Sequence, residues 1–348
     1  MPQTPVLPAV DVLGYLGPEG TFTHQAVGLL GHPVGRAVPG ASVAAVLADV
    51  GAGRADAGLV PVENSVEGSV NTTVDALASG PELRVVAEVL LPVRFVLAAA
   101  RGVRLSGVTR VLSHPHALAQ CRGWLGGHLP SAELVEVAST AAAAAEVGNA
   151  AAAAEVGNAA AAAEVGNAAA AAAAQAAGAG GKWTAAVCAP VAAELHGLSV
   201  LADGIGAPGP TAVTRFVLVA RPGTDVGALP PPTGADRTSL VVFIADNHPG
   251  ALLDVLEQFA ARGVDLTRLE SRPTGEAMGR YSFAIDCEGH LTDARVGEAL
   301  SGLRRTCRAV RFLGSYPRAD ATAANVRPGT AERDFTDAAA WLSGLRGG

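Results

Sequence analysis

The chain lacks the features of several classes of protein. Its 348 residues carry a formal net charge of −7, so it has no basic excess of the kind that binds nucleic acid or anionic lipid. Hydrophobic residues make up 49% of the chain, but much of this share is alanine and aromatic residues supply only 4%. No stretch approaches the ~18 uncharged apolar residues of a membrane-spanning helix. We therefore expect neither a nucleic-acid partner nor a membrane protein.

Cysteine is scarce and scattered. The four cysteines are Cys121, Cys188, Cys287 and Cys307. None of them forms a close pair of the zinc-binding or redox type. The first residues show no basic start followed by an apolar core, so no secretory signal is expected. These observations favour a cytoplasmic protein with reduced thiols and no bound metal.

Short apolar runs alternate with helical stretches over residues 12–221. This alternation is typical of parallel α/β architecture, and the number of elements fits two lobes with a cleft between them. Residues 222–236 have the proline- and glycine-rich composition of a linker. Over residues 237–316 the order is strand, helix, strand, strand, helix, strand, which is the ferredoxin-like order. Residues 317–348 form a tail in which we expect one amphipathic helix, at about 334–345.

A nonapeptide, AAAAAEVGN, occurs three times in tandem over residues 141–167, and the alanine tract then continues to Gln175. At roughly 100° per residue, nine residues turn a helix through about 900°, so successive glutamates point to opposite sides and no continuous apolar stripe forms. Alanine favours a helix and each Gly-Asn pair weakens it. We predict that about 141–175 is an insertion, a long and frayed helix that projects from the body and has no function of its own.

The most informative segment follows an apolar strand at residues 58–62. Carboxylate, amide and hydroxyl groups are dense there, and no basic residue interrupts them. They belong to Glu63, Asn64, Ser65, Ser69, Asn71 and Thr72. In open α/β sheets, ligands bind beyond the carboxyl ends of strands. The segment therefore predicts one wall of a ligand-binding cleft.

Two further segments join predicted strands to helices. Gly17-Pro18-Glu19-Gly20-Thr21 offers backbone amides and a hydroxyl that suit a carboxylate, and it matches neither of the common nucleotide-binding loops. Ser113-His114-Pro115-His116, with Gln120, follows another strand. Its two histidines invite a metal, but zinc sites need three or four ligands and no further set at metal spacing is present. Hydrogen bonding into the cleft by Ser113 and Gln120 is the better interpretation.

Two short segments complete the set. Ser139-Thr140 ends a strand and caps the alanine-rich helix. Thr214-Arg215-Phe216 begins the last strand of the first unit, and Arg215 there is able to bind a carboxylate through two nitrogens. Taken singly, each segment is explained as well by a turn, a cap or a strand end.

Taken together and in order, these segments resemble the prephenate dehydratase family. The resemblance rests on Gly17-Pro18-Glu19-Gly20-Thr21-Phe22, Val60-Pro61-Val62-Glu63-Asn64-Ser65 with Gly68, Ser113-His114-Pro115 with Ala117-Leu118 and Gln120, Ser139-Thr140-Ala141-Ala142, and Thr214-Arg215-Phe216. In the second unit, Gly250-Ala251-Leu252 and Glu270-Ser271-Arg272-Pro273 resemble the two phenylalanine-binding motifs of the regulatory ACT domain found in these enzymes. The resemblance covers about residues 12–316.

The resemblance implies a fold and a reaction. The fold is a two-lobed catalytic domain similar to periplasmic binding proteins, over 12–221, followed by a ferredoxin-like ACT domain over 237–316. The reaction converts prephenate to phenylpyruvate with loss of water and carbon dioxide, in phenylalanine biosynthesis, and it needs no cofactor. The family also implies a homodimer or homotetramer whose activity L-phenylalanine lowers.

The resemblance also implies roles for residues of this chain. Thr214 matches the threonine that protonates the departing hydroxyl. The other residues expected to take part in catalysis are Glu63, Asn64, Ser113 and Gln120. The residues expected to bind substrate are Thr21, Ser65, Ser139, Thr140, Arg215 and Phe216. The residues expected to bind phenylalanine are Gly250, Ala251, Leu252, Glu270, Ser271, Arg272 and Pro273.

Two alternatives stay open at this stage. The same chemistry on arogenate, which carries an amino group where prephenate has its keto group, is not separated from prephenate turnover by the sequence. A non-catalytic sensor built from a binding-protein-like cleft and an ACT unit is a different class. Thr214 discriminates against the sensor, because a sensor has no use for a hydroxyl acid.

Overall fold

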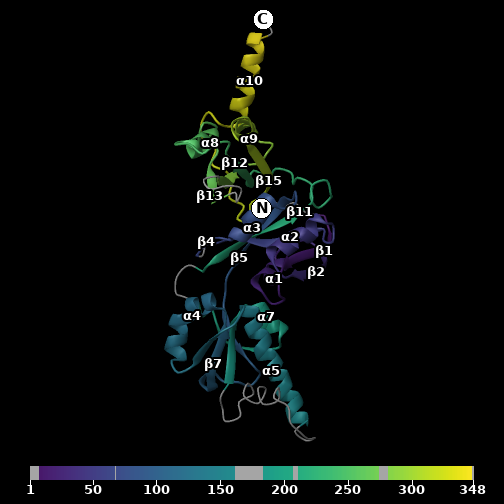
Figure 1. Ribbon diagram of the computed structural model, residues 1–348, viewed down its shortest axis with the longest axis vertical. Coiled ribbons are helices and arrows are strands. Elements are labelled where there is room, and N and C mark those ends of the chain that lie inside the picture. The colour runs from purple at the N-terminus through teal and green to yellow at the C-terminus, as the bar shows by residue number, and fades with distance from the viewer. Residues whose placement is uncertain (1–7, 67, 161–182, 207–210, 274–280, 347–348) are drawn as a thin grey trace.

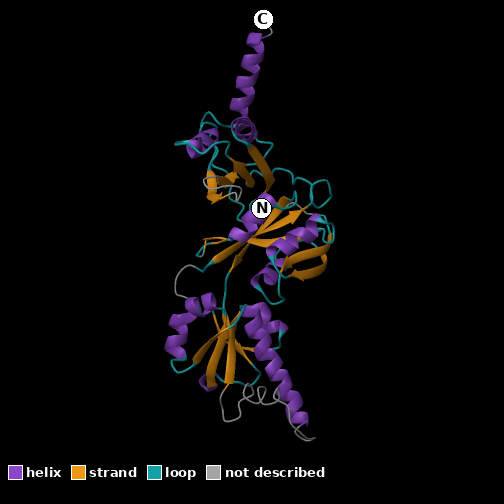
Figure 2. Ribbon diagram, viewed as in Figure 1, coloured by secondary structure: helices purple, strands orange, loops and turns teal. Residues whose placement is uncertain are grey.

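The computed structural model describes residues 8–346 except for residue 67 and residues 161–182, 207–210 and 274–280. The described chain forms two α/β lobes and an ACT-type domain, stacked along the long axis of the molecule (Figures 1 and 2). The first lobe lies between the other two parts. One end of the first lobe therefore adjoins the second lobe, and one face of its sheet packs against the C-terminal domain.

The first lobe is built on a sheet of order β2-β1-β3-β11-β5, with a short β4 paired to β3. The strands are β1 (Val10–Leu16), β2 (Val34–Gly40), β3 (Ala57–Asn64), β4 (Gly68–Ser69), β5 (Arg84–Pro92) and β11 (Val213–Ala220). The helices are α1 (Phe22–Val27), α2 (Val43–Gly51) and α3 (Asn71–Ser79). Strand β11 returns from the second lobe and runs antiparallel to both β3 and β5. The expectation of a parallel sheet is therefore wrong for this strand.

The second lobe contains a sheet of order β10-β6-β9-β7-β8. Its strands are β6 (Val96–Ala99), β7 (Val108–Ser113), β8 (Glu133–Glu136), β9 (Trp183–Cys188) and β10 (Ser199–Asp203). Its helices are the 3₁₀ turn η1 (Leu105–Gly107), α4 (Pro115–His128), α5 (Thr140–Ala160) and α7 (Pro190–Leu195). The sheet is mixed, because β6 runs antiparallel to β9 and β10 while β7 runs parallel to β8 and β9.

The C-terminal domain has the predicted ferredoxin-like order, with a sheet of order β13-β14-β12-β15. Its elements are β12 (Asp236–Phe243), α8 (Ala251–Ala260), β13 (Leu266–Pro273), β14 (Tyr281–Glu288), α9 (Ala294–Thr306) and β15 (Ala309–Pro317). The tail adds α10 (Glu332–Arg346), which projects from the far end of the molecule (Figure 1). The amphipathic helix expected at about 334–345 therefore exists, with its ends one or two residues further out.

Apolar spacing explains why these helices form where they do. In α2 the buried residues Val43, Val46, Leu47 and Val50 repeat at helical spacing, and Ser42 caps the helix by accepting a hydrogen bond from the amide of Ala45. Helix α8 buries Ala251, Val255 and Phe259, one residue per turn, against its sheet. Both helices have one apolar face, so each is fixed to a sheet by burial of that face.

Two faces of two sheets pack against each other where the first lobe meets the C-terminal domain. One hydrophobic cluster combines Val62, Val85 and Val217 of the first lobe with Val241 and Tyr316 of the C-terminal domain. The strands approach closely: a Cβ added at Gly314 of β15 would lie 2.2 Å from the carbonyl oxygen of Val85. The linker over residues 222–236 is held at its end as well, because the Asp236 carboxylate accepts hydrogen bonds from the amides of Thr233 and Gly234.

The alanine-rich helix is partly confirmed and partly corrected. Ser139 caps α5 by accepting a hydrogen bond from the amide of Ala142 at 3.0 Å. In the first repeat, Ala143, Ala144 and Val147 are buried in the core of the second lobe, and Ala141 is buried as well. This part of the tract therefore belongs to the folded body and does not project from it. A Cβ at Gly148 would lie 2.7 Å from Cβ of His196, so this glycine allows α5 to approach α7. Residues 161–175 of the predicted insertion lie outside the described residues.

No helix among the described residues is both long enough and apolar enough to cross a membrane.

Removing two of the three repeats, residues 150–167, is expected to leave the protein folded and active. Among the residues of α5 whose side chains the structure describes, the buried ones lie in the first repeat. The eighteen deleted residues equal about five turns of an ideal helix, so the deletion keeps the phase of the predicted alanine-rich helix. We expect a thermal midpoint within about 2 °C of the intact chain, which corresponds to at most about 1.5 kcal/mol for a chain of this size. Differential scanning calorimetry measures it, and a fall of 10 °C would show that the deleted repeats are part of the core.

Candidate active site

A pocket of about 340 Å³ opens between the two lobes. From the first lobe it is lined by residues of the β1–α1 loop and the facing ends of β3 and β11, including Gly17, Thr21, Phe22, Asn64 and Thr214. From the second lobe it is lined by the starts of α4 and α5 and the chain entering β6, including Phe95, His114, His116, Gln120, Ser139 and Thr140. The cleft expected between the lobes is therefore present.

Thr214 and Asn64 meet at the end of two paired strands. They are opposite one another in the register of β11 and β3. The Asn64 side-chain amide donates a hydrogen bond to the Thr214 hydroxyl oxygen at 2.8 Å, and its carbonyl oxygen accepts from the amide of Val66 at 2.9 Å. Because the Thr214 oxygen accepts this bond, the hydroxyl proton is available for donation into the pocket.

Helix starts converge on the same pocket. Ser139 caps α5, and His114 caps α4, where Pro115 is the first helical residue. Thr21 caps the short α1 by accepting from the amide of His24, and its hydroxyl lies 3.0 Å from the carbonyl oxygen of Pro18. The unpaired amides and the dipole of a helix start favour negative charge. The geometry therefore suits an anionic ligand, although no lysine or arginine is among the residues that line the pocket.

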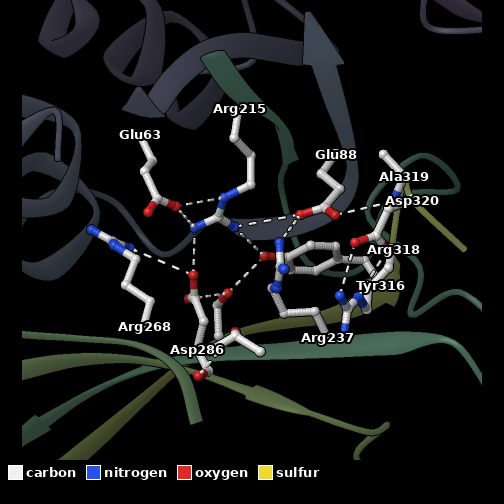
Figure 3. Close-up of polar contacts among 12 residues, drawn as sticks. Glu63, Glu88, Arg215, Arg237, Arg268, Asp286, Tyr316, Arg318, Ala319 and Asp320 are labelled. Atoms are coloured by element: carbon white, nitrogen blue, oxygen red, sulfur yellow. Dashed lines mark hydrogen bonds and ion pairs between the residues drawn. The ribbon is translucent and has the colours of Figure 1, made fainter. Parts of the chain in front are cut away.

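Arg215 and Glu63 lie on the other face of the same two strands, which corrects the expectation that Arg215 binds substrate. Side chains alternate along a strand, so the neighbours of Thr214 and Asn64 point away from the pocket and toward the C-terminal domain. The Arg215 side chain is only 7% exposed and ion-pairs with Glu63, Glu88 and Asp286 (Figure 3). Neither Arg215 nor Glu63 is among the residues that line the pocket.

Three other predicted site residues support the pocket without lining it. Ser113 is fully buried and donates a hydrogen bond to the carbonyl oxygen of Val187 at 2.6 Å. Phe216 is 1% exposed and packs in the core under α1. The Ser65 hydroxyl accepts from the amide of Val213 at 2.9 Å, which ties the end of β3 to β11. All three side chains therefore contact the chain around the pocket and not its interior.

The two ACT motifs lie on different surfaces of the C-terminal domain. Gly250 has φ +96° and precedes α8, and Ala251 lines a second pocket of about 340 Å³ beside Cys307. In the other motif, Arg272 reaches the first lobe and pairs with Asp75 of α3 through two hydrogen bonds of 2.9 and 2.6 Å. Glu270 pairs with Arg268 at 2.8 Å. The phenylalanine-binding role expected for Glu270 and Arg272 stays a prediction.

Several pocket residues were not among the residues expected to act in catalysis or binding. His114 and His116 lie with ring centroids 5.1 Å apart, and Phe22 and Phe95 pack edge to face at 5.4 Å. Phe22 and the two histidines adjoin predicted site residues in the sequence, and this adjacency is the signal that identifies them. Phe95 carried no polar signal; it lines the pocket because the chain crosses between the lobes there. Among the described residues, no group of three or more metal-binding side chains comes together.

Comparison with known proteins agrees with this geometry. A model of the prephenate dehydratase family matches residues 13–168, and a model of the ACT domain matches residues 238–305. The chain is 44% identical to prephenate dehydratase of Amycolatopsis methanolica over 336 residues, which cover 97% of this chain and 98% of the relative. It is 42% identical to that of Mycobacterium tuberculosis over 347 residues, which cover 97% and 94%.

A solved structure supports the same assignment for the fold. It is the crystal structure of prephenate dehydratase from Arthrobacter aurescens in complex with L-Phe, which is 45% identical and superposes with a TM-score of 0.81, covering 97% of this chain and all of that one. The predicted architecture of two α/β lobes followed by an ACT domain is thereby confirmed. With similarity of this degree over nearly its whole length, the chain belongs to the prephenate dehydratase family.

Proposed function

We propose that this chain converts prephenate to phenylpyruvate with loss of water and carbon dioxide, the step that commits prephenate to phenylalanine. The observation that carries the proposal is the Thr214 hydroxyl, which accepts a hydrogen bond from Asn64 at 2.8 Å and keeps its own proton for the pocket. We assign the reaction to residues 12–221, regulation to residues 237–316, a linker to 222–236 and no role in turnover to 317–348.

The proposed chemistry requires the protein to position the substrate and to donate one proton. The prephenate ring becomes aromatic as the hydroxyl and carbon dioxide leave, so the protein has to hold a dicarboxylate and protonate the departing oxygen. We assign that proton to Thr214. Asn64 orients the Thr214 oxygen, and Gln120 reaches the pocket from the second lobe. No step requires a cofactor.

Binding of the two substrate carboxylates is assigned to helix starts. Ser139 and Thr140 stand at the start of α5, and Thr21 stands at the start of α1. Since Arg215 is engaged by three carboxylates on the opposite face of β11, anion recognition falls to these amides and hydroxyls. We assign Glu63, Ser65, Ser113 and Phe216 to the support of this arrangement.

We further propose a homodimer or homotetramer that L-phenylalanine inhibits through the ACT domain. The ACT domain and the L-Phe complex of the 45% identical relative support regulation. Exposed apolar residues support association: Leu253 on α8 and Leu269 on β13 are 56% and 39% exposed. The four cysteines are free thiols, which is consistent with a reducing, cytoplasmic location.

Replacing Thr214 by alanine is expected to lower kcat on prephenate by about 10²- to 10⁴-fold, the usual contribution of a positioned acid. Binding of a substrate analogue should change little, because the helix starts remain. Thr214→Ser keeps a hydroxyl and should recover most of the lost turnover. Steady-state kinetics and calorimetric titration measure the two effects, and full activity of Thr214→Ala would refute the assigned role. A parallel assay with arogenate decides between the two substrates.

Replacing Ser113 by alanine is expected to affect stability rather than catalysis. The buried Val187 carbonyl would lose its hydrogen-bond donor, which costs about 1–2 kcal/mol in the free energy of unfolding. Because the hydroxyl does not line the pocket, kcat should stay within about threefold of the parent. Urea unfolding and prephenate turnover test both statements. A large fall in kcat with unchanged stability would return Ser113 to the catalytic group.

Replacing Gly250 by alanine is expected to weaken inhibition by phenylalanine by about tenfold without changing turnover in its absence. A side chain is strained at φ +96° and would stand where a ligand approaches the amides at the start of α8. Gly102→Ala is a matched control, since Gly102 also has positive φ with no atom near its missing Cβ. If phenylalanine produced no binding heat with the parent chain, the proposed regulation would be wrong.

A further inference from the structure

One cluster of buried charge joins the C-terminal domain to the strand that carries Thr214. Arg215 lies at its centre, and Figure 3 shows the guanidinium reaching from β11 into a ring of carboxylates. Its Nη2 is 2.5 Å from the carboxylate of Asp286 on β14 and 3.1 Å from that of Glu63 on β3. Its Nη1 is 3.4 Å from the carboxylate of Glu88 on β5. The guanidinium therefore bonds to both neighbours of β11 and to the other domain.

Asp286 is held in place from its own domain as well. Ser239 donates a hydrogen bond to its second carboxylate oxygen at 2.7 Å, and Arg268 lies 3.7 Å away. Burial alone would raise the pKa of Asp286, but the positive charges of Arg215 and Arg268 and the Ser239 hydrogen bond lower this pKa to about 2. Asp286 is therefore a carboxylate at neutral pH, and its position follows the position of the ACT sheet.

Glu88 adds two further parts of the chain to the cluster. Its side chain is 1% exposed and ion-pairs with Arg237 at the start of β12. Its other oxygen accepts a hydrogen bond from the amide of Ala319, in the segment after β15, at 3.0 Å. The ends of the C-terminal domain are thus anchored to β5, the strand beside β11.

The strands change register at this point. Arg215 is opposite Glu63, but Phe216 is opposite Pro61, so Val62 is an extra residue on β3. Such a bulge locally re-aims side chains and weakens the ladder. It lies one residue from the pair that faces the pocket, Thr214 and Asn64. Because a bulged ladder does not fix this register by itself, the bond between the Arg215 and Glu63 side chains contributes to it.

We propose that Arg215 is a positioning residue of the active site: its bonds to Glu63 and to Asp286 of the ACT domain hold the ends of β11 and β3 so that the Thr214 hydroxyl meets the Asn64 amide. The expected change in turnover rests on the proposed function, whereas the expected change in the distance between Asn64 and Thr214 does not. This role of Arg215 makes the placement of the ACT sheet a determinant of pocket geometry, through one residue on the reverse side of the catalytic strand.

The kinetic arm uses Asp286→Asn, which keeps the shape of the side chain and removes its charge. We expect kcat on prephenate to fall about tenfold with KM changed less than twofold, because the proton donor is displaced while the helix starts stay in place. Asp49→Asn is the matched control: Asp49 also pairs with an arginine at 2.5 Å, Arg54, but on the exposed surface of α2. It should stay within twofold of the parent.

A double-mutant cycle separates positioning from general loosening. In an Asn64→Ala background the amide that meets Thr214 is gone, so adding Asp286→Asn should cost less than twofold. A further tenfold loss would show that the two effects are independent and would overturn the proposal. If Asp286→Asn does not fold, Glu63→Gln, which acts on the same guanidinium from the half-exposed side of β3, takes its place in every arm.

A structural experiment tests the positioning role of Arg215 independently of the substrate. In a crystal structure of Asp286→Asn, the distance from the Asn64 amide nitrogen to the Thr214 oxygen should exceed 3.5 Å, against 2.8 Å in the parent. An unchanged distance would overturn the positioning role. If the parent chain did not turn over prephenate, the proposed function would fail, and this distance would still confirm or refute the role of Arg215.

Discussion

The alternation of side chains along β11 is the constraint on which the rest of the structure depends. This strand lies between β3 and β5, and both of its faces are covered, one by the pocket and α1 and the other by the C-terminal domain. Thr214 and Arg215 are consecutive residues, so Thr214 faces the pocket and Arg215 faces the C-terminal domain. A single strand therefore connects the lobe cleft with the domain interface, and neither surface is able to move far without the other.

The charges at the interface are costly to separate. Taking a guanidinium and several carboxylates out of water carries a large desolvation penalty, and removing one partner from such a buried pair typically costs about 3–5 kcal/mol. Around this cluster, Val62, Val217 and Val241 pack in a common apolar cluster. The apolar contacts favour association of the two sheets, and the charges restrict the relative positions at which the sheets fit.

Much of the fold and half of the site were predictable from the sequence, for identifiable reasons. The strands that line the cleft are strongly apolar and end in polar residues. Asn64 stands at a strand end and Ser139 at a helix cap, and Gln120 lies in the second turn of the helix that follows another strand. Arg215 was misplaced because its charge suggested a ligand, whereas its position next to Thr214 on a strand requires the opposite face. Glu63, expected to take part in catalysis, lies on that same opposite face.

What the sequence did not contain was the docking of the two domains. Nothing local in β14 shows that Asp286 faces Arg215, because the two residues are 71 positions apart in the chain. Strands β2 and β10 have weak sequence signals, because Val34–Gly40 is broken by glycine and proline and Ser199–Asp203 is short and partly polar. In each case tertiary pairing supplies what local preference lacks.

The shared cluster limits the modularity of the chain. Regulatory domains of the ferredoxin-like type look like interchangeable parts, to be exchanged between proteins by recombination or by design. Here the recipient lobe presents a buried guanidinium to whatever sheet covers it. A grafted domain must supply an anion at the position of Asp286, or the buried guanidinium loses one of its three carboxylate partners beside the reacting group.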